Sequence, residues 1–409
     1  MNILYIAHRI PYPPNKGDKI RSFHQIRYLA SKHSVSLACL IDDREDLRYI
    51  KTLGQYCTSV DAIYRDKNLA TLLSVPGLLK RKPISVAFFY SRELQKKILA
   101  RVRREKFDRI VVFCSAMAEY VRQLAGIPKI MDFVDVDSEK WRVYADHQPV
   151  SVSWIYRMEA DRLARYEEAV AQDFDQSIFV SEKEADIFRR RINDDRITVN
   201  SNGVDLEYFA PRGSDRVNSG SPVIVFSGTM DYFPNIDAVR YFCSDIFPLI
   251  RNVFPTVQFY IAGRNPPRKV VELNGQLGVT VTGGVPDVRP FLEKAWVSVA
   301  PLRIARGVQN KVLESMAMGL PVVGTSRAFQ GLEATSGDGI RLADSPEIFA
   351  REVTALLENF DVRRECSRQA RQYVQRNHRW EDHGRRLEVT LERVGETNER
   401  SGVDQRVFA

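Results

Sequence analysis

The chain has 409 residues, and 60 Lys and Arg against 52 Asp and Glu give it a formal net charge of +8. At roughly 150 residues per domain the length predicts two or three domains, and 44% hydrophobic with 27% charged residues excludes long disorder. Five cysteines are scattered without a CxxC pair, which excludes a disulfide framework and a zinc ribbon and favours a reducing compartment.

Short β-rich apolar runs alternate with helical patterns in the first half, which predicts a parallel sheet covered on both faces. The longest largely apolar run, 110–118, falls well short of the roughly 20 residues of a membrane-spanning helix. We therefore expect a cytoplasmic protein, at most peripheral on the inner face of the plasma membrane. The predicted strands are Ile3–His8, Val35–Ile41, Val60–Tyr64, Arg109–Cys114, Lys129–Val134 and Gln176–Ser181, and helices are predicted at Asp18–Ser31, Arg92–Arg104 and Val152–Ala171.

The first predicted strand leads into a loop, residues 8–19, that three prolines stiffen. Gly17 allows a ligand to approach the backbone closely, and Asp18 can cap the helix that follows. Ligands bind at the carboxyl ends of the strands in such sheets, so this loop is a candidate site, with a structural turn as the alternative. It has neither a GxGxxG nor a Walker sequence, which argues against dinucleotide and P-loop chemistry.

Positive charge concentrates in residues 80–106, which contain ten basic and two acidic residues. Leu94, Ile98 and Val102 recur there at helical spacing, which predicts a helix with one apolar face and one basic face. The interpretations are a core-facing helix with a solvated outer face, or a surface that attracts anionic lipid head groups or a lipid-linked diphosphate. The basic residues are not interleaved with aromatic ones, so we expect no nucleic-acid partner.

Three carboxylates, Asp132, Asp135 and Asp137, lie close together at the end of the strand predicted at Lys129–Val134. Buried carboxylates are costly unless they serve a ligand, a cap or a basic partner. Asp135 is the preferred functional residue. Asp137 or Ser138 can cap a helix beginning at Glu139, and a DxD-like metal site is the competing interpretation.

A linker rich in Pro, Gly and Ser, Phe209–Pro222, separates the halves. The predicted domains are 1–208, 209–378 and a C-terminal crossing helix with a frayed tail, 379–409. Helical patterns also occupy the stretch from about Asp361 to Glu396. The second half repeats the alternation, with strands at Val223–Phe226, Val257–Ala262, Val279–Thr282, Val297–Ala300 and Pro321–Gly324.

The segment 299–323 reads as strand, glycine-containing loop, helix and strand. Gly307 and Val308 would place bare N–H groups at the helix N-terminus, which favours an anion. Lys311 and Glu314 share one face of that helix, and Arg303 and Arg306 precede it. Cations beside one carboxylate suit a diphosphate with an attached ribose.

This segment resembles the donor-site signature of glycosyltransferase family 4, retaining enzymes with the GT-B fold. The stretches 199–211, with Asn202-Gly203-Val204-Asp205, and 226–230, with its glycine turn at Gly228, are similar to that family, as is 260–264, ending in Arg264. The opening loop and residues 133–141 also resemble the sugar transferases of exosortase (PEP-CTERM) polysaccharide systems. Two departures stand out: Arg306 occupies the position of the first of two donor-site glutamates, and residues 229–235 replace a usual Arg and Lys.

The resemblance implies an α/β fold of the GT-B type, in which two Rossmann-like doubly wound domains face a cleft and C-terminal helices cross back to the first domain. It implies a retaining transferase, in exopolysaccharide biosynthesis, that moves a sugar from a nucleoside diphosphate sugar to a glycan or lipid-linked acceptor. No cofactor, metal or covalent enzyme intermediate is expected. The implied donor residues are Lys311 and Arg303 for the diphosphate, Gly228, Gly307 and Val308 for backbone contacts, Glu314 for the ribose, and Arg264 and Arg306 nearby. The implied acceptor residues are Gly17, Arg21 and Asp135.

Other functions fit the same two α/β halves less well. A nucleotide-sugar epimerase should carry acid/base carboxylates and histidines, and of the six histidines only His8 ends a predicted strand. A non-catalytic nucleotide-sugar binding protein remains the second alternative. The sequence leaves the base, the sugar and the acceptor open.

Overall fold

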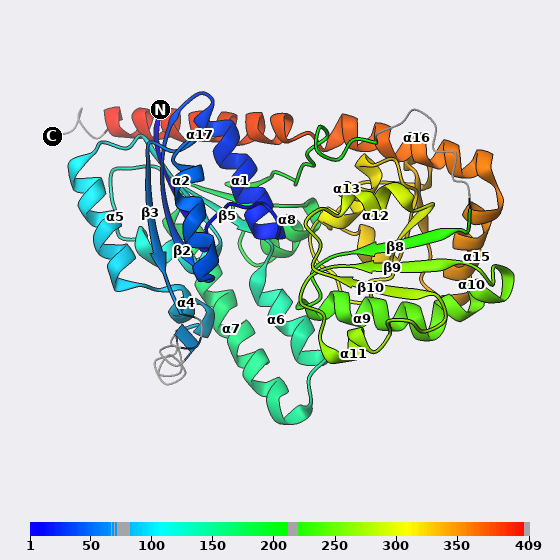
Figure 1. Ribbon diagram of the computed structural model, residues 1–409. Helices are drawn as coiled ribbons and strands as arrows, with labels where there is room; N and C mark the ends of the chain where they lie inside the picture. The colour runs from blue at the N-terminus through cyan, green and yellow to red at the C-terminus, as the bar shows by residue number, and fades with distance from the viewer. Residues whose placement is uncertain (67, 69, 72–81, 212–219, 405–409) are drawn as a thin grey trace. The chain divides into compact units, whose positions relative to one another are not determined.

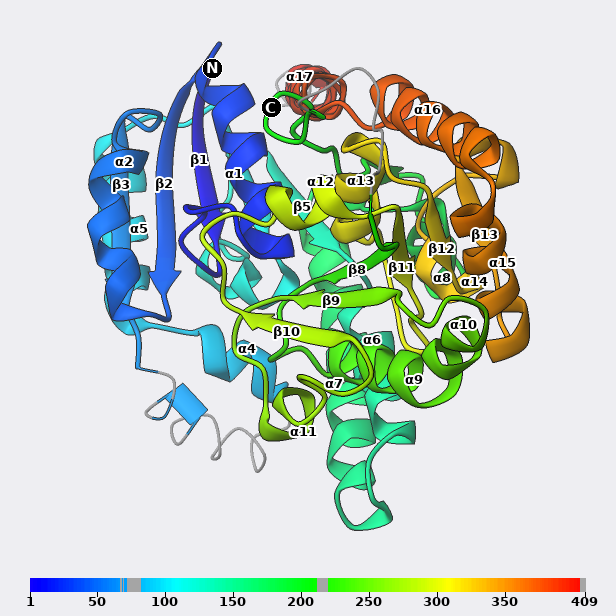
Figure 2. The same ribbon diagram turned by 45° about the vertical axis from the view of Figure 1, so that its right-hand side comes forward.

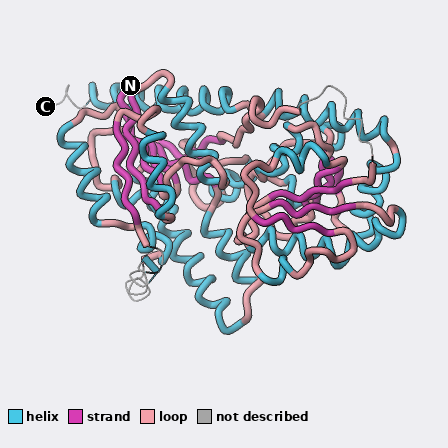
Figure 3. The backbone as a smooth tube through the Cα atoms, in the orientation of Figure 1, coloured by secondary structure: helices cyan, strands magenta, loops and turns pink. Residues whose placement is uncertain are grey.

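The computed structural model describes residues 1–66, 68, 70–71, 82–211 and 220–404. They form two compact units. Unit 1 contains Met1–Ser201 together with the C-terminal segment from Trp380, and unit 2 contains Asn202–Arg379. In each unit the strands lie between helices, as the tube drawing shows (Figure 3).

Unit 1 is built on a seven-stranded parallel sheet in the order β3-β2-β1-β4-β5-β6-β7 (Figure 1). The inner strand β1 is buried from Ile3 to Ala7, as expected of a strand that is covered on both faces. Ala7 pairs with Cys39 of β2 and with Phe113 of β4, so the strands on either side of β1 end at the same edge. The strands are β1 (Asn2–Ala7), β2 (Ser34–Ile41), β3 (Ser59–Tyr64), β4 (Arg109–Phe113), β5 (Lys129–Val134), β6 (Gln176–Phe179) and β7 (Ile197–Val199).

Serine hydroxyls cap the N-termini of α5 and α8 in unit 1. Ser91 Oγ accepts a hydrogen bond from the N–H of Leu94 at the start of α5, and Ser181 Oγ accepts one from the N–H of Glu184 at the start of α8. Leu94 and Ile98 bury the apolar face of α5. The helices are α1 (Gly17–Ala30), α2 (Ile50–Leu53), α4 (Ile84–Phe89), α5 (Arg92–Arg104), α6 (Asp137–Asp146), α7 (Val150–Asp173), α8 (Glu182–Arg189) and α17 (Trp380–Asp404), with 3-10 turns η1 (Arg44–Tyr49) and η3 (Ser115–Tyr120).

The C-terminal helix α17 packs on α1, so the chain returns to its first domain as the resemblance implied (Figure 2). Glu388 Oε2 accepts hydrogen bonds from the hydroxyl of Tyr28 at 2.9 Å and from Nζ of Lys32 at 2.6 Å. A Cβ at Gly384 would lie 2.2 Å from the Tyr28 ring, so the close approach of the two helices depends on this glycine. The tail expected to fray is helical as far as Asp404.

Unit 2 contains a six-stranded parallel sheet in the order β10-β9-β8-β11-β12-β13. Its strands are β8 (Val223–Ser227), β9 (Gln258–Ala262), β10 (Val279–Gly283), β11 (Val297–Ala300), β12 (Val322–Gly324) and β13 (Ile340–Leu342). Its helices are α9 (Phe233–Tyr241), α10 (Phe247–Val253), α11 (Arg268–Val271), α12 (Arg289–Lys294), α13 (Asn310–Ala317), α14 (Ser326–Phe329), α15 (Pro346–Glu358) and α16 (Phe360–Asn377), with a π-helical turn η4 (Phe242–Ile246) and a 3-10 turn η5 (Ser336–Asp338).

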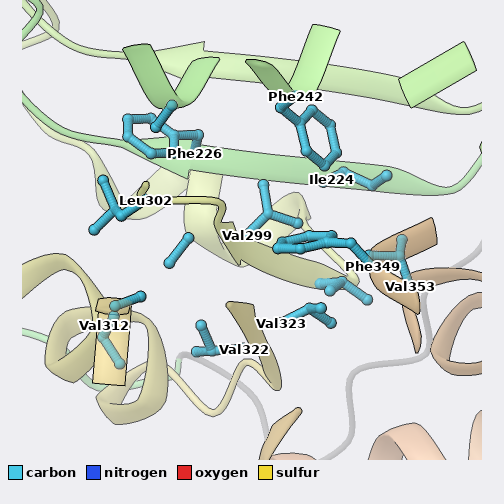
Figure 4. Close-up of a cluster of buried hydrophobic side chains, with 14 of the residues drawn as sticks. Ile224, Phe226, Phe242, Val299, Leu302, Val312, Val322, Val323, Phe349 and Val353 are labelled. Atoms are coloured by element: carbon cyan, nitrogen blue, oxygen red, sulfur yellow. The ribbon is translucent and has the colours of Figure 1, made fainter. Parts of the chain in front are cut away.

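The core of unit 2 fixes the helix that carries the candidate donor residues. Val312 of α13 is 1% exposed and points toward the side chains of the sheet (Figure 4). Burying a side chain of this kind contributes about 1.5–3 kcal/mol, and its neighbour Lys311 is thereby held in one position on the helix. Its companions in Figure 4 include Ile224, Phe226, Val299, Leu302, Val322, Val323, Phe349 and Val353.

The chain passes between the units at Ser201/Asn202 and again at Arg379/Trp380, and not within the predicted linker Phe209–Pro222. Residues 202–211 belong to unit 2 because Val204 pairs with Arg379 and Phe209 packs against the core of that unit. Residues 212–219 of the linker lie outside the described part of the chain. Among the described helices, none is long and apolar enough to cross a membrane.

The predicted fold class is confirmed, and every predicted strand is present with ends within two residues of the prediction. The three-residue strands β7 and β13 were not predicted, since so short a run shows no alternation. The helix predicted at Arg92–Arg104 is α5, whereas Lys80 and Arg81 of the basic stretch lie outside the described residues. Two predicted caps were wrong: α1 begins at Gly17 with Lys16 as N-cap, and α6 begins at Asp137 with Val136 as N-cap.

Candidate functional site

The candidate donor site lies in unit 2, where β11 ends and α13 begins. Lys311 is the second residue of α13. The N-cap residue Gln309 makes no capping hydrogen bond with its side chain, which donates instead to the carbonyl oxygen of Arg306 at 2.9 Å. The first turn of this helix therefore presents N–H groups without a side-chain cap, and the helix dipole favours an anion there.

Lys311 is held between a residue of α9 and an aromatic ring of β8. Its Nζ donates to Oδ1 of Asn235 and lies 4.7 Å from the centroid of the Phe226 ring. The amide nitrogen of Asn235 donates to the carbonyl oxygen of Thr229 at 2.8 Å, so this side chain is fixed at both ends. Asn235 is 4% exposed. It was not predicted as a site residue, because its role depends on a contact with a residue far along the chain.

The glycine turn after β8 gives Lys311 its space. A Cβ at Gly228, whose φ is +152°, would lie 2.8 Å from Nδ2 of Asn235 and 3.3 Å from Cε of Lys311. A Cβ at Gly263 would lie 1.8 Å from the carbonyl oxygen of Gly228. The N–H of Gly228 donates to Ala262 at 3.0 Å and is engaged in the sheet. Gly228 therefore makes room for Lys311 through its missing side chain, and its N–H is already used in the sheet.

Two titratable groups on α13 have displaced pKa values. Burial lowers the pKa of Lys311 to about 7, an effect that the carboxylate of Glu314 opposes. Burial also raises the pKa of Glu314 to about 7, against the charge of Lys311. The site therefore has a lysine whose charge depends on what binds beside it.

The loop before α13 is shaped by a second close contact between glycines. Gly307 has a φ of +60°. A Cβ at Gly331 would lie 2.3 Å from the carbonyl oxygen of Gly307 and 2.7 Å from the nitrogen of Val308. Gly331 was not predicted, although only a glycine permits this approach. The neighbouring Arg306 is half-buried.

Arg303 and Arg264 are placed differently from Lys311. Arg303 is 53% exposed, forms a bidentate ion pair with Asp237 of α9 and lies over the ring of Tyr241. The structure shows no contact between Arg303 and Lys311. Arg264 is half-buried beside the Gly228 turn, and its carbonyl oxygen accepts from the N–H of Met230 at 2.8 Å.

The stretch around Asn202-Gly203-Val204-Asp205 packs onto the same helix. Nδ2 of Asn202 donates to Oδ1 of Asn310, the first residue of α13, at 3.0 Å. The carbonyl oxygen of Asn202 lies 2.8 Å from Nδ1 of His378. Within unit 2, these contacts bring Asn202, from the segment 199–211, next to the start of α13 in the segment 299–323.

Of the expected acceptor residues, Arg21 is part of the core of unit 1. It is 0% exposed and pairs with both carboxylate oxygens of Asp132, at 2.9 and 3.1 Å. Gln25 donates to the same carboxylate at 2.7 Å and accepts from the hydroxyl of Tyr5 at 2.6 Å. Arg21 therefore fixes α1 to β5 and is not available to an acceptor.

Gly17 and Asp135 do lie at the carboxyl edge of the sheet. Gly17 is exposed as the first residue of α1. Asp135 is half-buried directly after β5, where Val134 has a φ of +68°. Asp137 begins α6, and Ser138 donates to Glu167 with its N–H and its hydroxyl. Within the described ranges, no group of three or more His, Cys, Asp or Glu residues is arranged to hold a metal ion.

Two parallel Rossmann-like units with this strand order define the GT-B fold, and solved structures of that class match almost the whole chain. The sucrose-phosphate synthase of Thermosynechococcus elongatus has a TM-score of 0.72 at 15% identity, over 97% of this chain and 100% of that one. HepE of Anabaena, solved in complex with UDP and glucose, has a TM-score of 0.67 at 14% identity, over 96% of this chain and 99% of that one.

Residues 221–359, all within unit 2, match the family model described as Glycosyl transferases group 1. This match and the GT-B fold together support a glycosyltransferase. A protein described as an uncharacterized 44.6 kDa protein in the cps region of Klebsiella pneumoniae is 19% identical over 403 residues, 92% of this chain and 96% of that protein.

Proposed function

We propose that this protein is a retaining glycosyltransferase that transfers a sugar from a nucleoside diphosphate sugar to a glycan or a lipid-linked acceptor. The observation that carries the proposal is the position of Lys311, at the uncapped start of α13 and against the Gly228 turn. A cation, helix N–H groups and a backbone without a side chain are the features that a diphosphate needs.

Transfer requires stabilisation of the diphosphate as its bond to the sugar breaks. Lys311 and the dipole of α13 would supply this by electrostatics fixed in advance, without a metal. Val308 and Gly307 would contribute backbone contacts, and Glu314 would accept hydrogen bonds from the ribose. Arg303 has a smaller part in this scheme than we expected, since Asp237 already offsets its charge.

We also propose that the enzyme acts in exopolysaccharide biosynthesis, on the cytoplasmic side of the membrane. The relative from a cps region supports this context. Membership of glycosyltransferase family 4, and the link to exosortase systems, rest on the stretches around 133–141 and 299–323. Arg264 and Arg306 are proposed to lie near the donor, where Arg306 replaces the glutamate that its relatives use.

Binding of the donor nucleotide is tested by thermal shift of the full chain with UDP, GDP, ADP and dTDP, each with and without EDTA. We expect one diphosphate to raise the melting temperature equally in both conditions. Lys311→Met should abolish the shift, whereas Lys269→Met, which removes an exposed lysine of α11, should leave it unchanged. A shift that EDTA removes would contradict the metal-free site, and no shift with any nucleotide would contradict the donor site.

The reaction is tested with the sugar nucleotide of the base so identified. Turnover in Lys311→Ala should fall by at least about 100-fold, the scale of losing one charge-stabilising group. The anomeric configuration of the product, read by NMR, should equal that of the donor. An inverted product would refute the retaining assignment, and an epimerised donor without transfer would show the alternative chemistry.

An anionic membrane surface is the proposed partner of α5. Arg92, Lys96 and Lys97 are exposed on this helix, as are Arg103 and Arg104. Arg101 is different, because it pairs with Asp61 at 2.7 Å and serves the fold. Each exposed lysine near an anionic bilayer contributes about 1 kcal/mol, so losing two should weaken binding by roughly 30-fold.

The matched comparison uses two charge-removing double variants of unit 1. Lys96→Gln with Lys97→Gln should weaken cosedimentation with phosphatidylglycerol vesicles. Arg385→Gln with Arg386→Gln, on the exposed face of α17, should not. Equal loss in the two double variants, or binding to neutral vesicles, would contradict a specific role of α5.

A further inference from the structure

The carboxyl edge of the unit 1 sheet has a second cluster of polar groups, between β1 and β4. The strand order reverses at this point, with β2 on one side of β1 and β4 on the other. Ala7 pairs with Phe113, so His8 and Cys114 follow at the edge from neighbouring strands. Doubly wound sheets bind ligands at such a switch point.

His8 is held there by a carboxylate of α1. Its Nε2 lies 3.0 Å from Oδ2 of Asp18, and its side chain is 10% exposed. Burial alone would raise the pKa of Asp18, but the hydrogen bond from His8 and the charge of Arg9 hold it well below its usual value. The hydrogen bond to an ionised Asp18 needs a hydrogen on Nε2, and the tautomer that carries it there has its lone pair at Nδ1.

Two buried polar atoms at this edge have no hydrogen-bond partner among the described residues, Nδ1 of His8 and Oγ of Ser115. The His8 ring lies between Phe113, stacked at 5.7 Å, and the edge-on ring of Phe89 at 5.2 Å. Leaving such an atom unpaired costs about 1–3 kcal/mol. Cys114, directly before Ser115, has a φ of +77°, a strained conformation for a residue other than glycine.

The charges of this edge favour a neutral ligand. Arg9 is bound by the carboxylates of Asp18 and Asp42, and Lys19 is bound by Asp46. The charges of Arg9 and Lys19 are thus already offset, and an anionic group would gain little from these two side chains. The hydroxyls of a sugar carry no charge and can both donate and accept hydrogen bonds.

We propose that this edge binds a sugar hydroxyl of the acceptor, with Nδ1 of His8 accepting from the hydroxyl and Oγ of Ser115 donating to a sugar oxygen. The proposal rests on the proposed function, because it assigns the acceptor end of the transfer. It adds His8, Asp18 and Ser115 to the site residues, with Asp18 as a positioning residue that fixes the tautomer of His8.

Two substitutions of His8 separate binding from folding. Gln places a polar group near the position of Nε2, so His8→Gln keeps the contact with Asp18 and removes the acceptor at Nδ1. Asn places a polar group near the position of Nδ1, so His8→Asn keeps the proposed contact. Ser115→Ala removes the second group, and His147→Gln, at an exposed position, is the matched control.

The test measures binding of methyl glucoside, methyl galactoside and methyl mannoside to the full chain by saturation-transfer NMR, with the UDP, GDP, ADP and dTDP thermal shifts as a second readout. We expect one glycoside to bind the unaltered protein, and His8→Gln and Ser115→Ala to weaken it by about 10-fold, the scale of one buried hydrogen bond. His8→Asn and His147→Gln should bind it almost as the unaltered protein does. The nucleotide shifts should stay unchanged throughout.

Unaltered glycoside binding in His8→Gln would overturn the proposal, as would no glycoside binding by a protein that does bind a nucleotide. The latter result would mean that buried water satisfies the two atoms. If no nucleotide binds to the unaltered protein, the donor site and the proposed function fail, whatever the glycosides do.

Discussion

Binding of a nucleoside diphosphate should place a proton on Lys311. In the free protein burial lowers the pKa of Lys311 to about 7. At pH 8 roughly nine-tenths of these side chains are therefore neutral. A diphosphate beside Nζ favours the charged form. Binding at pH 8 should accordingly take up close to one proton from the buffer.

The affinity for the nucleoside diphosphate should depend on pH, because binding is coupled to protonation of Lys311. Once the ligand restores the pKa of Lys311 toward its ordinary value, each pH unit well above 7 weakens binding by about 10-fold. From pH 7 to pH 9 this makes about 50-fold, because half of the lysine side chains are already neutral at pH 7. Below pH 7 the limiting group is Glu314, whose pKa burial raises to about 7. Its protonation removes an acceptor for the ribose hydroxyls. The tightest binding is expected near pH 7.

The assay is titration calorimetry at pH 8 in Tris and in phosphate, whose ionisation enthalpies differ. The difference between the two apparent enthalpies gives the number of protons taken up. Lys311→Arg keeps a permanent charge and should bind without proton uptake, whereas Lys311→Met should bind weakly and also without uptake. Equal enthalpies in the two buffers for the unaltered protein, or uptake that persists in Lys311→Met, would refute the reasoning.

Three further outcomes are expected. Asn235→Ala frees Lys311 from its partner and should weaken nucleotide binding by about 10-fold, measured by calorimetry, with unchanged binding as the contrary result. Asp132→Asn leaves Arg21 buried without a carboxylate and should lower the free energy of unfolding by about 3–5 kcal/mol in urea titrations; a loss below 1 kcal/mol would return Arg21 to the list of ligand contacts. Burial raises the pKa of Glu167 to about 8. The protonated side chain therefore stabilises the fold fully below the unfolded pKa near 4.5, and this contribution is lost as the pH rises through 8. Glu167→Gln should melt close to the unaltered protein at pH 5 and at a higher temperature than it at pH 9, and equal melting temperatures at pH 9 would contradict this.

The sequence predicted the elements of both sheets because buried parallel strands are nearly continuous apolar runs that helical patterns separate. Strands β7 and β13 escaped prediction because each has three residues. The boundary between the units was expected in the linker, whose composition is typical of a connection. The contacts of Val204 and Phe209 instead attach the preceding residues to unit 2.

The candidate donor site was only partly predictable. Lys311 and Glu314 were identified because both lie on one helix, so their spacing alone places them on one face. Asn235 and Gly331 were missed, since each acts through a residue distant in the sequence. Arg303 was expected at the diphosphate, and nothing in its local sequence reveals that Asp237, on another helix, engages it.

Arg21 shows how a residue can serve a site without touching a ligand. Its ion pair with Asp132 ties α1 to β5 inside unit 1. Asp132 also accepts from the N–H of Val134 at 3.1 Å, the residue where the chain turns through a φ of +68°.

The ion pair between Arg21 and Asp132 therefore fixes the two elements, α1 and β5, that border the edge proposed for the acceptor. Helix α1 carries Asp18, which orients His8, and β5 ends where Asp135 follows. Buried against Asp132, Arg21 fixes the two elements relative to each other, and its charge is already paired. In the proposed scheme, unit 1 takes a neutral acceptor because Arg9, Lys19 and Arg21 are already paired with carboxylates, whereas unit 2 keeps Lys311 for the diphosphate.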